Sequence, residues 1–277
     1  MTPKDFANLA DLVLRRSGLV LTPGKNALAA SKLNPVARRF GFRDSTALLR
    51  ELPYPSEELA RAITEALTTN DTAFFRDGTA FAFLARQALP ELVRARAASK
   101  RIRIWCAAVS TGQEAYSLAT VIDEMGLAPL GWKIDLIGTD LNESAIARAK
   151  EGVYASYEIE RGLSPRLLER YFTEENGQWR VVDRLRRMVT FRTFNLLDHF
   201  GWLGEIDIVL CRNVLLYFEP GERAEVHAKL TSVLAPDGYL FLGDTETAPY
   251  HVVRDPTVRG LYVSPRGLQR NLRRLAG

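Results

Sequence analysis

The chain has 277 residues, of which 47% are apolar and 25% charged, and its net charge is +4. This length allows one large domain or two modest ones, and the composition is that of an ordinary globular protein. Cys106 and Cys211 are too few for a disulfide framework or a cysteine zinc site, so we expect buried, reduced thiols and no metal centre. The N-terminus lacks the apolar segment of a signal peptide, and no stretch approaches the ~20 apolar residues that span a bilayer. These features predict a cytoplasmic protein.

Positive charge is concentrated at the start of the chain. Residues 1–50 contain nine lysines and arginines against three acids, a local balance of +6. Such a positive field suits an acidic partner, either protein or nucleic acid. A solvated basic face without a partner is the alternative interpretation.

The first ~85 residues show helical periodicity and no convincing strands. An apolar stripe on the first helix consists of Phe6, Leu9, Ala10, Val13 and Leu14. A second helix is expected from about Lys25, with Pro35 interrupting or restarting it. Later helices are expected after capping residues at Asp44 or Ser45 and at Ser56. The pattern predicts a small all-helical domain.

From about residue 100, apolar strand candidates alternate with helical segments. The strand candidates are 101–108, 133–140, 207–213, 238–244 and 261–264, with one more short strand within 187–198. Helical segments follow three of them, at about 112–124, 142–150 and 220–234. Such alternation favours parallel pairing with right-handed crossovers. We therefore expect an α/β fold with an open, doubly wound, mostly parallel sheet.

One strongly charged segment, about 155–190, does not fit this alternation. Asn176 and Gly177 lie between alternating residues there, which is a hairpin signal. We expect an inserted β-subdomain that projects from the sheet. The expected organisation is a helical domain over 1–85, with a linker over 68–85, and a sheet domain over 86–277 that holds the insertion.

Polar residues close four of the predicted strands. They are Ser110-Thr111-Gly112, Asp140, Asn195 and Arg212-Asn213. Ligands of doubly wound sheets bind beyond the carboxyl ends of the strands. A carboxylate at the end of the second strand can accept hydrogen bonds from both ribose hydroxyls of an adenosine group.

The loop after the first strand indicates which cofactor is bound. It contains neither G-x-G-x-x-G nor GxxxxGK[ST], so it offers no cradle for a pyrophosphate. Glu114 instead places a carboxylate in the first helical turn, which suits a cation. S-adenosylmethionine (SAM) has a ribose and an amino group but no phosphate, so the loop favours SAM over NAD. Alternatively, Glu114 completes a capping box with Ser110 or Thr111.

The segment "TTNDTAFFRD" (68–77) has two interpretations. Its paired phenylalanines could form a packing hinge between the domains. The segment could also form a lid, with Arg76 reaching the cofactor site.

Six blocks of sequence together resemble the CheR family of chemotaxis receptor methyltransferases. They are "TNDTAFFRD", "IWCAAVSTGQEAYSLA", "TDLNESAIARAKEGVY", "FNLLD", "CRNVLLYF" and "PDGYLFLGDTE", in the family's order. The resemblance extends over residues 1 to about 265. It implies a class I SAM-methyltransferase-like fold. It also implies methyl transfer from SAM to glutamate carboxylates of methyl-accepting chemotaxis receptors.

The resemblance implies roles for individual residues. Arg76 and Tyr217 are expected closest to the chemistry. The expected cofactor contacts are Asn70, Thr72, Arg76, Gly112, Glu114, Asp140, Asn195, Leu196, Arg212 and Asn213. Lys32, Arg38 and Arg39 are expected to dock the acidic helical bundle of a receptor.

The implied reaction needs no general base, because a glutamate carboxylate is already ionised at neutral pH. The three histidines, His199, His227 and His251, lie in no matching motif.

The sequence departs from the family pattern at three places. Gln113-Glu114-Ala115 stands where the family usually has Glu-Glu-Pro, Pro35 falls in the basic helix, and the turn "TEENGQ" lacks a glycine-rich extension. Because of this short turn, we expect no strong binding of a receptor C-terminal pentapeptide. We also expect a monomer without nucleic-acid binding or membrane insertion.

Two alternative functions remain open. One is a paralogue that methylates a different signalling protein. The other is a non-catalytic SAM-binding signalling module, against which the intact Arg76, Glu114, Asp140 and Tyr217 argue.

Overall fold

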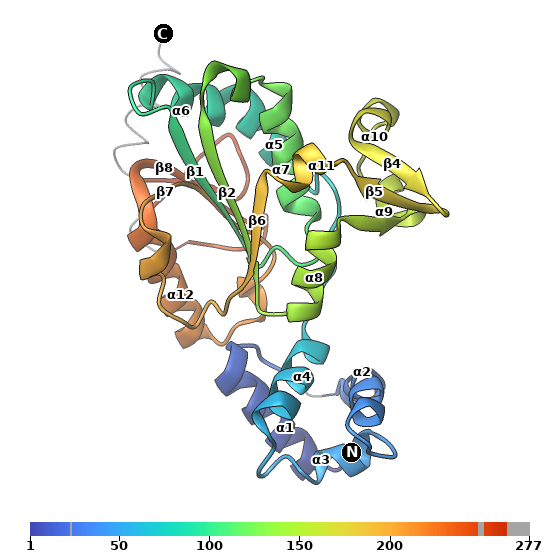
Figure 1. Ribbon diagram of the computed structural model, residues 1–277. Coiled ribbons are helices and arrows are strands. Elements are labelled where there is room, and N and C mark those ends of the chain that lie inside the picture. The colour runs from blue at the N-terminus through green and yellow to red at the C-terminus, as the bar shows by residue number, and fades with distance from the viewer. Residues whose placement is uncertain (23, 249–251, 265–277) are drawn as a thin grey trace.

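A computed structural model of the chain describes residues 1–22, 24–248 and 252–264 (Figure 1). His251 and the end of the expected sheet domain, 265–277, lie outside the described residues. None of the helices in these described ranges combines the length and apolar character needed to cross a bilayer.

Four helices form the N-terminal domain at the bottom of Figure 1. They are α1 (Pro3–Ser17), α2 (Asn26–Arg39), α3 (Ser45–Leu49) and α4 (Glu57–Leu67). Two predicted caps are confirmed, since Asp44 accepts a hydrogen bond from the α3 backbone and Ser56 one from the α4 backbone. The core between the helices includes Leu9, Val13, Leu33, Leu48, Leu49 and Ile63.

The expected interruption at Pro35 is wrong, because α2 continues through it. A proline inside a helix removes one hydrogen bond and crowds the carbonyl four residues earlier, so the rest of the structure must compensate for it. Leu33 and Val36, on either side, are both buried in the domain core and hold the two halves of the helix in place. The three basic residues expected to dock a partner therefore lie on one continuous helix.

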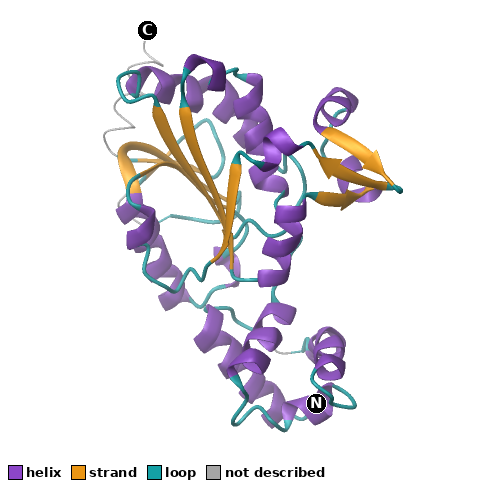
Figure 2. Cartoon of the chain, viewed as in Figure 1, coloured by secondary structure: helices purple, strands orange, loops and turns teal. Residues whose placement is uncertain are grey.

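The second domain is built on a seven-stranded sheet with the order β6-β2-β1-β7-β8-β10-β9 (Figure 2). Its strands are β1 (Arg101–Ala107), β2 (Lys133–Asp140), β6 (Val189–Thr193), β7 (Ile206–Cys211), β8 (Leu234–Leu242), β9 (Val253–Arg254) and β10 (Leu261–Val263). The first five pair in parallel, whereas β10 runs antiparallel to both β8 and β9. The expected doubly wound, mostly parallel sheet is confirmed.

Helices cover both faces of this sheet because side chains along a strand alternate between its faces. On β1, Ile104 and Cys106 belong to the core that contains α7 (Gln113–Glu124), whereas Trp105 and Ala107 belong to the core beneath α12 (Pro220–Val233). The helical segments around the sheet also include α8 (Glu143–Glu151) and short 3-10 turns at Ala128–Leu130, Gly201–Leu203 and Leu215–Tyr217.

The sequence did not indicate the helices over 79–95. This segment consists of α5 (Thr79–Phe83), a π-helical turn (Leu84–Ala88) and α6 (Leu89–Ala95). Its apolar side chains are buried in the core on the α7 face of the sheet.

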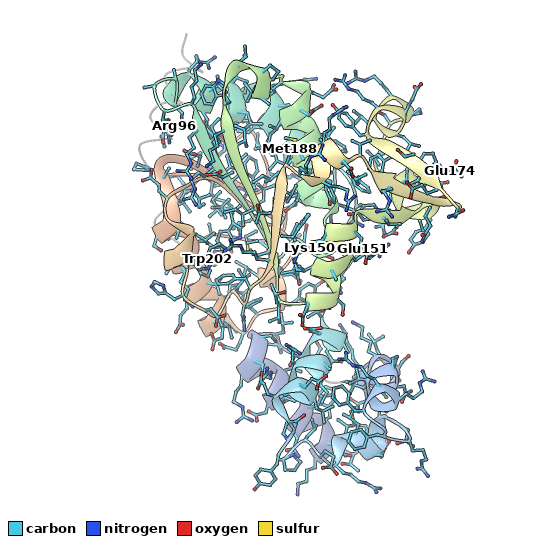
Figure 3. All side chains as sticks on the ribbon, in the orientation of Figure 1. Arg96, Lys150, Glu151, Glu174, Met188 and Trp202 are labelled. Atoms are coloured by element: carbon cyan, nitrogen blue, oxygen red, sulfur yellow. The ribbon has the colours of Figure 1, made fainter. Side chains whose placement is uncertain are left out.

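The predicted insertion is a separate three-stranded sheet that projects at the right of Figure 1. Its elements are β3 (Val153–Ala155), α9 (Ser156–Glu160), α10 (Pro165–Tyr171), β4 (Phe172–Glu175), β5 (Gln178–Val181) and α11 (Asp183–Arg186). The hairpin turn is confirmed, since Asn176 and Gly177 have φ of +53° and +75°. Glu174 marks the outer part of this hairpin, away from the large sheet (Figure 3).

Candidate functional site

A cavity of about 210 Å³ lies where the carboxyl ends of the central strands face the helical domain. Its walls come from both domains and from the segment that joins them. Residues expected to bind the cofactor or act on it make up much of the lining. They are Asn70, Thr72, Arg76, Glu114, Asp140, Asn195, Leu196, Arg212, Asn213 and Tyr217.

Gly112 is not among the described residues that line the cavity. It has a φ of +98° and immediately precedes α7. A Cβ there would lie 3.0 Å from Cβ of Ala149 on α8 and 3.1 Å from the hydroxyl of Tyr154. The glycine therefore lets the loop turn and pack closely against α8. Its effect on the cavity is indirect, through the shape of the loop.

Asp140 ends β2 and is only 7% exposed. Its Oδ2 accepts a hydrogen bond from the Ser110 N–H at 2.7 Å, and its Oδ1 accepts one from the Asn142 N–H at 2.9 Å. Burial raises the pKa of this carboxyl group, while the backbone N–H groups oppose that rise. Each oxygen keeps acceptor capacity beyond its single backbone bond, so the carboxylate is oriented and can still accept two vicinal hydroxyls.

Arg212 is a buried cation held by two acids. Its Nη1 donates to Oε2 of Glu114 at 3.0 Å, and its Nη2 donates to Oδ2 of Asp77 at 2.7 Å. The Arg212 side chain is 3% exposed and that of Glu114 13%, so this pair is largely shielded from water, whereas the Asp77 side chain is 36% exposed. Asp77 was missed at the sequence level, although it directly follows the expected Arg76.

The alternative role of Glu114 as a capping residue is wrong. The N-cap of α7 is Gly112, and no side chain caps that helix. Glu114 instead directs Oε2 to Arg212, and no described residue donates to its Oε1. Burial raises the pKa of Glu114, and the positive charge of Arg212 only partly opposes this.

Both interpretations of the segment 68–77 hold in part. Phe74 is buried in the sheet-domain core and makes edge contacts with Tyr154 and Phe172, at centroid distances of 5.0 and 5.3 Å. Phe74 therefore fixes the segment to the sheet domain, as expected for a packing hinge between the domains. Arg76 in the same segment lines the cavity, as the lid interpretation expected, and Asn70 and Thr72, expected from the family resemblance, line it too.

Backbone strain is concentrated in the loops around the cavity. Among the described residues, seven non-glycine residues have positive φ, and five of them lie in these loops. Such conformations cost free energy and persist where the surrounding structure imposes them. The loops are therefore held in shape before a ligand arrives. The five are Phe75, Asp77, Ala108, Ser110 and Asn213.

The helical domain is hydrogen-bonded to two of the loops that line the cavity. The N–H of Val20 donates to the carbonyl of Tyr217 at 2.8 Å, and the N–H of Glu219 donates to the carbonyl of Gly18 at 2.9 Å. Asn195 donates through Nδ2 to the carbonyl of Arg16 at 2.7 Å. The position of Tyr217, which is 40% exposed, therefore depends on the N-terminal domain.

Gly18 should be much more sensitive to replacement than other glycines of the helical domain. It has a φ of +72°, and a Cβ there would lie 2.7 Å from the ring of Phe218. Gly41 has a similar φ of +80° but nothing within 4 Å. We expect Gly41→Ala to lower the free energy of unfolding by ~1 kcal/mol through strain alone. Gly18→Ala should cost a further ~1–3 kcal/mol through overpacking. Denaturant titration measures both, and equal losses would contradict the close packing at Gly18.

The three expected docking residues lie in different surroundings. Lys32 lines the cavity, and its Nζ donates to the carbonyl of Thr68 at 2.7 Å. Arg38 and Arg39 are exposed on α2 and do not line the cavity, and Arg39 pairs with Glu58 at 3.1 Å. Lys32 thus fastens α2 to the end of α4, whereas the two arginines face solvent.

Comparisons with known proteins match both domains. The family described as "CheR methyltransferase, all-alpha domain" matches residues 4–68, and "CheR methyltransferase, SAM binding domain" matches residues 70–259. The chain is 38% identical over 246 residues to "Chemotaxis protein methyltransferase 1" of Pseudomonas aeruginosa, covering 87% of this chain and 89% of the relative. It is 37% identical over 247 residues to "Chemotaxis protein methyltransferase Cher2" of Pseudomonas putida, covering 87% and 90%. A protein of Vibrio parahaemolyticus, "Chemotaxis protein methyltransferase", is 36% identical over 255 residues, covering 89% and 90%.

Proposed function

Because the chain belongs to the CheR family of chemotaxis protein methyltransferases, we propose that it methylates glutamate side chains of methyl-accepting chemotaxis receptors in the cytoplasm. SAM is the cofactor of its SAM-binding domain. The observation that best supports the proposal is a cavity that combines Asp140, Glu114 and Tyr217. This set offers two carboxylates to a cofactor and a hydroxyl to an acceptor.

The side chains of the cavity suit SAM chemically. We propose that Asp140 accepts hydrogen bonds from both ribose hydroxyls and that Oε1 of Glu114 accepts one from the amino group. Charge-assisted hydrogen bonds of this kind are stronger than neutral ones. We assign the remaining contacts with the cofactor to Asn70, Thr72, Arg76, Asn195, Leu196, Arg212 and Asn213, which line the same cavity.

The reaction depends on placement rather than on proton transfer. Bound SAM supplies an electrophilic methyl group, and the receptor supplies an ionised carboxylate as the nucleophile. The protein must hold the two about 3–3.5 Å apart and in line. Arg76 can attract the incoming carboxylate, and Tyr217 can hydrogen-bond it, because its hydroxyl has no partner among the described residues.

The receptor is proposed to approach along α2. Replacing both Arg38 and Arg39 with glutamate should raise KM for receptor-containing membranes by roughly tenfold and leave SAM affinity unchanged. Arg187→Glu is the control for charge reversal away from α2, since that arginine is 74% exposed on the sheet domain. An unchanged KM in the double variant, or an equal rise in the control, would rule out docking on α2.

The β-subdomain is not expected to tether the enzyme to a receptor tail. Its hairpin closes with the two-residue turn Asn176-Gly177, without an extension. We expect isothermal calorimetry with a receptor C-terminal pentapeptide to detect no binding at micromolar concentrations. A micromolar Kd would overturn this prediction.

The chemistry of the product tests the proposed function. The protein is incubated with methyl-labelled SAM and receptor-containing membranes, and the labelled protein is then treated with base. Glutamate methyl esters release methanol under these conditions, whereas N-methyl groups do not. Label in another signalling protein would favour a paralogue, and no base-labile label despite SAM binding would favour a non-catalytic module.

A further inference from the structure

Glu246 is a buried carboxylate outside the expected site, 7% exposed and four residues after β8. Its Oε2 accepts hydrogen bonds from the N–H groups of Asn213 at 2.8 Å and Gly243 at 2.6 Å. Its Oε1 accepts from the N–H groups of Val214 at 3.0 Å and Leu216 at 3.1 Å. One side chain thus satisfies four backbone donors, and three of them belong to residues 213–216.

Residues 213–216 connect the buried Arg212 to Tyr217 at the open side of the cavity. Asn213 has a φ of +59°, and the 3-10 turn Leu215–Tyr217 begins two residues later. A strained conformation of this kind needs contacts that enforce it. Three charge-assisted hydrogen bonds, donated by backbone N–H groups and accepted by one carboxylate, supply such contacts.

The surroundings of Glu246 keep its carboxylate in place. A Cβ on Gly243 would lie 2.8 Å from Oε2 of Glu246 and 2.6 Å from the side-chain nitrogen of Asn213, so only glycine leaves room there. The hydroxyl of Tyr262 donates to the backbone carbonyl of Glu246 at 3.2 Å. The carboxylate is therefore built into the loop as a fixed anchor.

We propose that Glu246 is a positioning residue for methyl transfer, acting through Tyr217. The proposal rests on the proposed function and adds to it a residue that does not line the cavity. Without the carboxylate, three N–H groups of a strained loop lose their acceptor, and each loss favours relaxation of the loop. A displacement of ~1 Å at the reacting centre can lower a rate by ~10²-fold.

The test compares Glu246→Gln with Asp255→Asn. Glutamine keeps the size of the side chain but replaces one accepting oxygen with an NH₂ group. Asp255 is also buried and accepts from the N–H groups of Thr257 at 2.8 Å and Val258 at 3.2 Å, in a loop that does not line the cavity. It controls for the general cost of altering a buried carboxylate.

Two readouts are expected to separate the variants. Amide hydrogen exchange at Val214 and Leu216 should accelerate by about tenfold or more in Glu246→Gln and stay unchanged in Asp255→Asn. The kcat for methyl transfer should fall by roughly 10- to 100-fold in Glu246→Gln, and SAM affinity should fall by a smaller factor, because Asn213 in the same loop is one of several proposed cofactor contacts.

A double variant tests whether Glu246 acts through Tyr217. If it does, Glu246→Gln should lower kcat much less in a Tyr217→Phe background than in the wild type. Equal losses in both backgrounds, or unchanged exchange at the two amides, would overturn the proposal. If Glu246→Gln does not fold, Tyr262→Phe, which removes only the hydroxyl that holds the Glu246 backbone, should produce smaller changes of the same sign.

The exchange and SAM-binding measurements need no acceptor protein. Failure of the wild type to methylate receptors would therefore overturn the proposed function alone. In that case, the exchange result would still decide whether Glu246 holds the loop.

Discussion

Replacing Glu114 with glutamine is expected to weaken SAM binding by roughly 10- to 100-fold, measured by calorimetry. The variant loses the charge proposed to hold the amino group, and a hydrogen bond to a charged group is worth ~1.5–3 kcal/mol. Arg212 keeps its pair with Asp77, so the buried cation is not left without a counter-charge.

Gln113→Ala is the matched control for this result. Gln113 is a buried neighbour, but it contacts Thr111 at 2.8 Å and Glu158 at 3.3 Å and does not line the cavity. We expect a much smaller loss of SAM affinity in this variant. Equal losses in the two variants would mean that the loop as a whole, and not the Glu114 charge, determines affinity.

The pH dependence of SAM binding gives a second measure of Glu114. Burial holds the pKa of this carboxyl group above its ordinary value of 4.5. Protonation removes the negative charge, so the affinity of the free enzyme for SAM should begin to fall at a pH above 4.5 as the solution is acidified. This acid limb should be smaller in Glu114→Gln, because Asp140, whose pKa burial also raises, is then the remaining carboxyl group proposed to bind SAM.

The second large effect is expected at Tyr217, where replacement by phenylalanine should lower kcat by about tenfold or more. The hydroxyl is free to contact the acceptor carboxylate, and a hydrogen bond that aligns the attacking oxygen with the methyl group of SAM affects kcat through that alignment. SAM affinity should be unchanged. Tyr54→Phe, at a residue 94% exposed on the helical domain, serves as the control. Full turnover in Tyr217→Phe would show that the hydroxyl has no role.

The position of the cavity could be predicted from the sequence because parallel strands end at one edge of their sheet. Asp140 and Arg212 each close a buried apolar strand, so the strand pattern alone brought them together. The helices over 79–95 could not be recognised in the same way. The π-helical turn Leu84–Ala88 inserts an extra residue per turn there, which shifts the apolar pattern out of the regular 3.6-residue period.

The contacts that shape the site are harder to predict. Glu246 lies 33 residues from Asn213 in sequence and binds backbone atoms, which no residue pattern reveals. The pairing of Arg212 with Asp77 likewise spans 135 residues. At Pro35 the sequence rule that proline interrupts a helix gave a wrong prediction. Burial of Leu33 and Val36 in the domain core outweighs the local effect of the proline.

The cavity is walled by both domains, and Asn195 and Val20 bridge them by hydrogen bonds. A ligand bound in such a cavity stabilises only the assembled arrangement, by RT ln(1 + [L]/Kd). Bound SAM should therefore stabilise the contact between the helical domain and the sheet domain. In thermodynamic terms, cofactor loss and domain separation are linked equilibria. The helical domain should therefore unfold at a higher temperature when SAM is present, although Asp140, the carboxylate proposed to bind the ribose, lies in the other domain.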